Sequence, residues 1–286
     1  MKCVRHVITI ALLGCSIIAN ADDIEYTPND SIRIENILGK ARHECVGDPP
    51  MLYFGRLFLG TPYVAQTLEA GSKEHLIINT RQLDCTTFVE TILALTTCHR
   101  YNQTTFRDFC RHLRRIRYRG GEIKDYTSRL HYFTWWGEDN ERMGFVKNIS
   151  RDGFPFTAQQ TININYMSTH PTTYKQLKQY PEFIPVIAKY ENWSNGQKYP
   201  YIPKSLFNKN EDELSDIKTG DIIAIITNKR GLDTSHIGVA VWLNGKLHMM
   251  HASSIYKKVV IDKNTFYTYS QRQTSQMGIR VYRVVL

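Results

Sequence analysis

The sequence has few cysteines and lacks several common catalytic motifs. Of its six cysteines, Cys3 and Cys15 fall within the first 21 residues, which leaves four for the rest of the chain. There is no C-x-x-C pair and no H-E-x-x-H, so the usual zinc-site patterns are missing. There is also no G-x-S-x-G elbow, so a serine hydrolase of that type has no support.

Long hydrophobic runs are missing as well. The longest apolar stretch, Val7 to Ala19, is shorter than the roughly 20 residues that a spanning helix needs. No repeat or low-complexity segment occurs, and the 42% apolar and 22% charged content is ordinary for a globular protein. We therefore expect a single domain with a well-buried core and no integral membrane segment.

The N-terminus has the pattern of an export signal. Two basic residues precede the apolar stretch, and "ANA" at 19–21 is a small-residue cleavage site. We expect a signal peptide at 1–21, a mature domain at 22–286, and a periplasmic or secreted protein. Alternatively "LLGC" at 12–15 would make a lipoprotein anchored to the membrane through Cys15, and a buried N-terminal helix is a third interpretation.

The four remaining cysteines are Cys45, Cys85, Cys98 and Cys110. In an oxidising compartment an even number could form disulfides. Cys98 and Cys110 flank a short turn between two helical patterns, so we expect them to be the pair if one forms.

The formal net charge of +9 favours an anionic partner. Nucleic acid is not expected, because the basic residues are scattered apart from "RHLRRIRYR" at 111–119 and an exported protein does not meet the usual nucleic acids. The alternative interpretation of that run is a solvated basic helix face.

Helical spacing dominates the first part of the chain. Apolar residues recur at helical intervals over 31–45 and 50–59, and again after Asp84, where the aspartate suits an N-cap. A further helix is expected at about 104–117.

The C-terminal part has the pattern of a β-sheet. Residues 220–286 contain β-branched runs separated by turn residues, and Asn244-Gly245 is a hairpin signal. Between helices and sheet, about 118–215 is rich in aromatics, Asn, Pro and Gly, which predicts an irregular insertion with short helices and strands. The fold class is therefore α+β, with helices packed on a C-terminal antiparallel sheet.

Cys85 is a candidate nucleophile because of its position. It follows the predicted N-cap Asp84 and shares a helix face with Phe88 and Val89. The positive end of a helix dipole favours a thiolate. The alternative is that Cys85 is simply a small buried residue.

His236 is the candidate partner of this cysteine. In the strand "SHIGVAVWL" it shares a face with Gly238 and Ala240, because side chains alternate along a strand. Such a small-residue face would leave room for the start of the cysteine helix. The alternative is a structural histidine.

Two more histidines follow the hairpin in "KLHMMHASS". His248 and His251 are three residues apart and so face opposite sides of an extended strand. We expect His251 to orient the ring of His236, with Ser253 on the same face as the fallback. His248 is expected to be structural or exposed.

These motifs together resemble a known family. "LGTPY", "LDCTTFVE", "TGDIIAI", "SHIGVAV" and "MHASS", in this order, are similar to the NlpC-type cell-wall cysteine peptidases of the papain-like superfamily. The Thr-Thr after the cysteine, "RLHYFTWW" and "HMMHASS" resemble its N-acetylmuramoyl-L-alanine amidase-like branch. The resemblance covers roughly residues 50 to 286.

The resemblance implies a papain-like fold with the nucleophile at a helix N-terminus. It also implies that Cys85 is the nucleophile, His236 the general base, His251 the third member and Tyr63 a residue that lines the active site; the alternative for Tyr63 is packing. The substrate would be peptidoglycan or muropeptide fragments, cut between N-acetylmuramic acid and L-alanine through a thioester, with no cofactor. Peptidoglycan is an anionic polymer outside the cytoplasm, which agrees with the charge and the export signal.

Three aromatic residues are secondary candidates for substrate binding. Tyr132, Trp135 and Trp136 could form an apolar wall for a sugar ring or stem peptide. The alternative is that they belong to the core.

Three other functions are open at this point. An endopeptidase of the same fold would cut the stem peptide after γ-D-glutamate. Cys85, His236 and His251 are also acceptable zinc ligands. A wall-binding module without activity is the third alternative.

Overall fold

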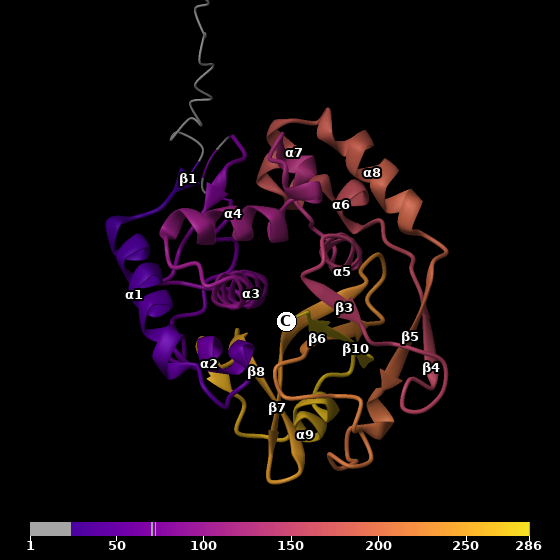
Figure 1. The fold of residues 1–286 in the computed structure, drawn as a ribbon. Helices are drawn as coiled ribbons and strands as arrows, with labels where there is room; N and C mark the ends of the chain where they lie inside the picture. Colours follow the sequence, from indigo (N-terminus) through magenta and orange to yellow (C-terminus); the bar gives the residue numbers. More distant parts are fainter. Residues whose placement is uncertain (1–23, 70, 72, 286) are drawn as a thin grey trace, which may run out of the picture.

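The computed structural model describes residues 24–69, 71 and 73–285 (Figure 1). The predicted signal peptide at 1–21 and the Cys15 anchor lie outside these residues. Within them, no helix is both long enough and apolar enough to cross a membrane.

The N-terminal part is helical, as the spacing predicts. Two short strands pair in parallel beside these helices. The elements are β1 (Ile24–Glu25), α1 (Pro28–Glu44), α2 (Pro50–Arg56), β2 (Leu76–Ile77), α3 (Cys85–Arg100) and α4 (Phe106–Arg117).

The segment between helices and sheet consists of short elements. Its strands join the main sheet, and its helices α6 to α8 gather at one corner of the molecule (Figure 1). The elements are η2 (Arg119–Gly121), η3 (Tyr126–Ser128), α5 (Phe133–Arg142), β3 (Val146–Asn148), β4 (Ala158–Thr161), α6 (Tyr166–Thr169), η4 (Pro171–Thr173), α7 (Lys175–Gln179), α8 (Phe183–Ser194), β5 (Lys198–Pro203) and η5 (Lys204–Leu206).

The C-terminal part forms the predicted antiparallel sheet. Its elements are β6 (Ile222–Thr227), β7 (Thr234–Leu243), β8 (Lys246–Ser253), β9 (Lys258–Ile261), α9 (Phe266–Gln271) and β10 (Gln276–Val284). The strand order is β4-β5-β10-β6-β7-β8-β9, and β3 also pairs with β10. Asn244 and Gly245, with φ of 50° and 70°, make the predicted turn between β7 and β8.

The sheet separates two apolar cores, because neighbouring residues of a strand point to opposite faces. On β6, Ile222 and Ala224 belong to the larger core, which also contains the helices α1 to α4. Ile223 and Ile225 belong to the smaller core, which contains Phe266 of α9. The sheet is therefore covered on both faces.

Helix α3 lies inside the larger core, and Figure 1 shows α1, α2 and α4 around it. Phe88, Val89, Ile92 and Leu93 have no exposed surface. Each such side chain contributes roughly 1.5–3 kcal/mol by leaving water. The helix therefore holds a fixed position against the sheet, and so does its first residue, Cys85.

A buried ion pair also fixes α3. Arg117 Nε of α4 lies 2.6 Å from Glu90 Oε2 of α3, and both side chains are 2% exposed. Because Arg117 is buried in this ion pair, the basic run at 111–119 does not form one continuous exposed surface. Arg111 and Arg114 of that run are exposed, so only part of it is a solvated basic face.

The start of α3 is held by a capping box, as the sequence predicts for Asp84. Asp84 Oδ1 accepts a hydrogen bond of 2.8 Å from the Thr87 backbone N–H. The Thr87 hydroxyl in turn accepts one of 2.9 Å from the Asp84 N–H. This reciprocal pair defines where the helix begins.

Candidate active site

Cys85 is the first residue of α3 and keeps part of its surface accessible. The backbone N–H of Ile237 on β7 acts on its Sγ and favours the thiolate, which works against the effect of burial on the pKa of the thiol. The pairing of β7 with β8 runs only from Val239–Met250 to Leu243–Lys246, so Ile237 lies before it. Cys85 therefore lies where the two strands separate, beside Ile237, the residue that follows His236 in the chain.

The loop before α3 brings Tyr63 to the same place. Tyr63 forms a parallel bridge with Leu83, and the N–H of Val64 donates to the carbonyl of Leu83. Tyr63 is half-buried, and burial followed by the nearby Cys85 and Asp84 raises the pKa of its hydroxyl. Tyr63 thus lies beside the cysteine, and it also packs partly against the larger core.

His236 and His251 are joined directly. His236 Nε2 and His251 Nδ1 are 2.6 Å apart, a hydrogen bond between two imidazoles. The rings are nearly perpendicular, at 84°. His236 keeps part of its surface accessible, whereas His251 is 1% exposed. The alternation of side chains along the strand thus correctly predicted that His251, and not His248, contacts His236.

Ser253, the fallback, and His248 have other partners. The Ser253 hydroxyl accepts a hydrogen bond from the Tyr256 N–H and so holds a turn. His248 Nδ1 lies 2.9 Å from the carbonyl oxygen of Asp262 and is structural, as expected.

The small-residue face of β7 does not make room for the cysteine helix, and that prediction is wrong. Ala240 and Met249 belong to the smaller core, whereas Ile237 and Val239 face α3. A Cβ atom at Gly238 would lie 2.7 Å from Cγ of Met249. The missing side chain therefore accommodates Met249 of β8. Cys85 is placed through the Ile237 backbone.

Asp262 is a site residue that the sequence did not reveal. Its Oδ2 lies 3.8 Å from His251 Nε2, and the carboxylate is 3% exposed. It directly follows β9, and its N–H donates to the carbonyl of Met249, so it lies diagonally opposite His251. The signal that could have found it is the aspartate that ends "KKVVID", on the strand next to "HMMHASS".

Tyr269 of α9 is another residue that sequence reasoning missed. Its ring centroid lies 5.7 Å from that of His251, in an edge-to-face arrangement. Burial raises the pKa of its hydroxyl to about 12, and Asp262 and Cys85 contribute to this shift. Tyr269 thus contacts His251 from the face of the sheet opposite to α3. The helix α9 had no clear periodic pattern in the sequence.

A cysteine at a helix start, two linked imidazoles and a buried carboxylate thus occupy one site. A family profile described as N-acetylmuramoyl-L-alanine amidase-like matches residues 53–279, most of the chain. The chain belongs to this amidase-like family. A search of curated proteins found no match.

Solved structures resemble this chain over most of its length. An N-acetylmuramoyl-L-alanine amidase from Bacteroides uniformis is 41% identical, with a TM-score of 0.77, over 83% of this chain and 98% of that one. A candidate xylanase from Bacteroides fragilis is 44% identical, with a TM-score of 0.75, over 80% and 98%. A Legionella pneumophila protein at 24% identity shares the fold, with a TM-score of 0.64 over 90% and 97%.

In the amidase-like site, the surroundings favour neutral forms of both Cys85 and His236. Burial, together with the carboxylate of Asp84, raises the pKa of the Cys85 thiol to about 12. Burial, together with His251, lowers the pKa of His236 to about 3. Burial of the thiol thus acts against the thiolate that the helix dipole favours. Neutral His236 can act as a base.

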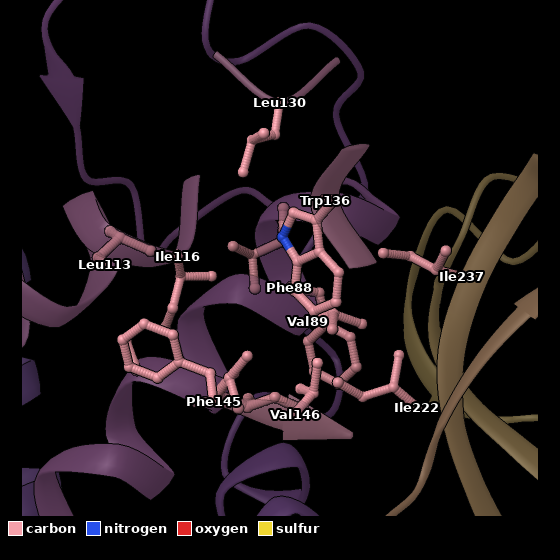
Figure 2. Close-up of a cluster of buried hydrophobic side chains, with 14 of the residues drawn as sticks. Phe88, Val89, Leu113, Ile116, Leu130, Trp136, Phe145, Val146, Ile222 and Ile237 are labelled. Atoms are coloured by element: carbon pink, nitrogen blue, oxygen red, sulfur yellow. The ribbon is translucent and has the colours of Figure 1, made fainter. Parts of the chain in front are cut away.

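The three predicted aromatic residues do not form a wall at this site. Tyr132, Trp135 and Trp136 are 3%, 2% and 1% exposed. Figure 2 shows Trp136 next to Phe88 and Val89 in the larger core. The prediction of a substrate-binding surface is wrong for these residues, because their rings fill the interior.

The expected disulfide between Cys98 and Cys110 is also not formed. Both thiols are free and buried, as part of the packing of α3 and α4. Burial raises the pKa of each to about 12. The turn between the helices does not bring the sulfur atoms into a bond.

The zinc alternative receives no geometric support from the residues that the structure describes. Among residues 24–285, gaps at 70 and 72 aside, no three His, Cys, Asp or Glu side chains are grouped so that they could hold a metal ion. The two imidazoles use Nε2 of His236 and Nδ1 of His251 for each other.

Proposed function

We propose that this amidase-like protein is a peptidoglycan hydrolase that uses Cys85 to cut the amide between N-acetylmuramic acid and L-alanine. The observation that carries this proposal is the contact of Cys85 Sγ with the N–H of Ile237, next to the His236–His251 pair. A nucleophile beside a base that a third group orients is the arrangement of cysteine hydrolases. The match to the amidase-like family supports the bond that is cut.

The first chemical step begins from the neutral thiol of Cys85 and the neutral imidazole of His236. His236 Nε2 is engaged by His251, which leaves Nδ1 to take the proton of Cys85. The sulfur attacks the lactyl carbonyl carbon as the proton leaves, so no preformed thiolate is required. We assign the backbone N–H of Cys85, which the helix ladder does not use, as a donor to the oxyanion.

The next steps release the two products. The imidazolium of His236 returns its proton to the L-alanine nitrogen, and the carbon–nitrogen bond breaks to leave a thioester on Cys85. Water, deprotonated by His236, attacks this thioester. The thiol and a free N-acetylmuramic acid carboxyl group are regenerated.

The larger context of the proposal follows from the sequence. The motif order supports a papain-like, NlpC-type organisation, with the nucleophile at a helix N-terminus. The pattern at 1–21 supports export to the periplasm or the exterior, and a lipoprotein anchored through Cys15 is the alternative.

Digestion of defined muropeptides tests the proposal. Purified wild type should release intact stem peptide that begins with L-alanine, identified by mass spectrometry. The variants Cys85→Ala and His236→Ala should lose at least about a thousandfold in rate. Shortened stems that end in γ-D-glutamate would instead identify the endopeptidase, and full activity of Cys85→Ala would exclude the mechanism.

The name of the Bacteroides fragilis neighbour makes glycoside hydrolysis the second candidate. Most glycosidases need two carboxyl groups about 5 to 9.5 Å apart on either side of the scissile bond. The buried carboxylate of this site, Asp262, faces His251 and accepts hydrogen bonds from Asn264. We expect no products from xylan oligosaccharides, and their appearance with wild type but not with Asp262→Asn would favour this candidate.

A further inference from the structure

Three neighbouring strands supply a line of polar groups that leads away from Cys85. His236 is on β7, His251 is on β8, and Asp262 directly follows β9. In this sheet the directly opposed pairs are Val239–Met250 and Met250–Ile261, so each member of the line is diagonal to the next. The separations are 2.6 Å between the imidazoles and 3.8 Å from His251 to Asp262.

The far nitrogen of His251 is the unusual member of this line. His251 Nε2 is buried and has no hydrogen-bond partner among the residues that the structure describes. A buried polar atom without a partner costs about 1–3 kcal/mol. Asp262 Oδ2 is the carboxylate oxygen aimed at it, while Oδ1 accepts from the N–H and the side-chain amide of Asn264.

The hydrogen bond between the imidazoles couples the tautomers of His236 and His251. For His236 to take a proton at Nδ1, its own proton must be on Nε2. That proton is then donated to His251 Nδ1, so His251 must carry its proton on Nε2. A carboxylate next to His251 Nε2 favours this arrangement, because it accepts and cannot donate when ionised.

We propose that Asp262 is a positioning residue that sets the tautomers of both histidines and so makes His236 a base toward Cys85. This inference rests on the proposed function, because it assigns His236 as the base. Asp262 acts only through His251. It does not touch the substrate.

The charge of Asp262 serves the same purpose. Burial would raise the pKa of this carboxyl, but the contact with His251 and the hydrogen bonds from Asn264 lower it. The other titratable groups around it are Tyr256, which donates to Oδ1, His248, whose Nδ1 contacts the Asp262 carbonyl oxygen, and Tyr269 on α9. Arg272 acts on Tyr256. An ionised Asp262 thus stabilises the imidazolium that forms after His236 takes the proton.

Replacement of Asp262 by asparagine tests the proposal. The new amide N–H₂ can donate to His251 Nε2, which forces the protons of both histidines onto the wrong nitrogens. We expect kcat for muropeptide cleavage to fall about 10²- to 10⁴-fold with KM within about threefold, as for loss of a tautomer-setting carboxylate. Asp262→Glu, which keeps the charge, should recover at least tenfold of this loss.

Asp221→Asn is the matched control. Asp221 is another buried carboxylate at the end of a strand of the same sheet, but it pairs with Arg283 and has no histidine partner. Its replacement should leave kcat within about threefold of wild type. An equal loss in both variants would mean that any buried carboxylate matters, and would overturn the proposal.

A double-mutant cycle with His251→Asn separates positioning from a general structural role. If Asp262 acts through His251, the double variant should be no slower than His251→Asn alone, within about threefold. Multiplicative losses would overturn the proposal, because Asp262 would then act by another path. Circular dichroism and the unfolding midpoint identify variants that fail to fold, and for these Asp262→Glu supplies the comparison.

Alkylation of Cys85 by iodoacetamide gives a readout that needs no muropeptide. Asp262→Asn should slow it at pH 7 at least about tenfold, and the difference should shrink as rising pH forms the thiolate without His236. If wild type does not cleave muropeptides but the two proteins still differ in alkylation rate in this pH-dependent way, the proposed function is refuted and the role of Asp262 stands. If wild type cleaves muropeptides but Asp262→Asn is alkylated at the wild-type rate at every pH, the role of Asp262 is refuted and the proposed function stands.

Discussion

The carboxylate of Asp84 opposes ionisation of Cys85, and its removal should make the thiol more reactive. Asp84 caps α3 and lies next to Cys85 in the chain. After burial, its negative charge is the largest contribution to the raised pKa of about 12. Asp84→Asn removes the charge and keeps a side-chain oxygen that can cap the helix, because Asn and Asp are about equally good N-caps.

The magnitude follows from the ionisation equilibrium. With a pKa of about 12, about one thiol in 10⁴ is ionised at pH 8. A charge within about 4–6 Å shifts a pKa by about 1–3 units, and each unit changes the thiolate fraction tenfold. A thiolate of lower pKa is also a weaker nucleophile, with a Brønsted slope of about 0.4–0.5. A shift of one to two units therefore predicts a rate about 3- to 16-fold higher.

The assay is alkylation by iodoacetamide between pH 7 and 9, with Cys85 identified by peptide mass mapping. Asp125→Asn is the control, because Asp125 caps η3 in the same manner and is not among the charges that act on Cys85. Its rate should equal that of wild type, and the unfolding midpoints of all three proteins should agree. An unchanged or slower rate for Asp84→Asn would refute the electrostatic reasoning.

Three further predictions concern packing. Trp135→Phe should lower the free energy of unfolding by about 1–3 kcal/mol in urea denaturation, because Ser194 loses the hydrogen bond from the indole. The KM for muropeptides should stay unchanged, and a raised KM would support the predicted substrate-binding role of Trp135. Gly238→Ala should cost about 1–3 kcal/mol, and Met249→Ala in the same chain should recover part of this cost in thermal unfolding. Additive losses there would contradict the proposed contact. Cys98 and Cys110 should both be labelled by a maleimide when the protein is unfolded without reductant. Two unlabelled cysteines and a mass about 2 Da below that of the reduced protein would instead reveal a disulfide.

The sequence allowed the secondary structure around the site to be predicted well. Strand alternation and the Asn244-Gly245 turn located β7 and β8, and the same alternation chose His251 over His248. The capping pattern located the start of α3 at Cys85. These features depend on neighbours in the chain, so local patterns suffice to predict them.

Features that depend on contacts between distant segments could not be predicted. Which face of β7 meets α3 is decided by how helix and sheet dock, and the small residues suggested the wrong one. Burial of Trp135 and Trp136 likewise depends on distant segments, because Trp135 donates to Ser194 of α8 and Trp136 packs beside Phe88 of α3 (Figure 2). The resemblance to the family guided the assignment of roles where local pattern alone left alternatives open.

The line from His236 to Asp262 also has a consequence for how the protein folds. Its members belong to successive antiparallel strands joined by short connections, so they can meet after closure of small loops at low entropic cost. Cys85 is separated from His236 by the long segment 86–235, so we expect its contact with the sheet, through the packing of α3, to form later. We expect the base to assemble before the nucleophile, so that the reactive pair is completed only in a chain whose core has closed.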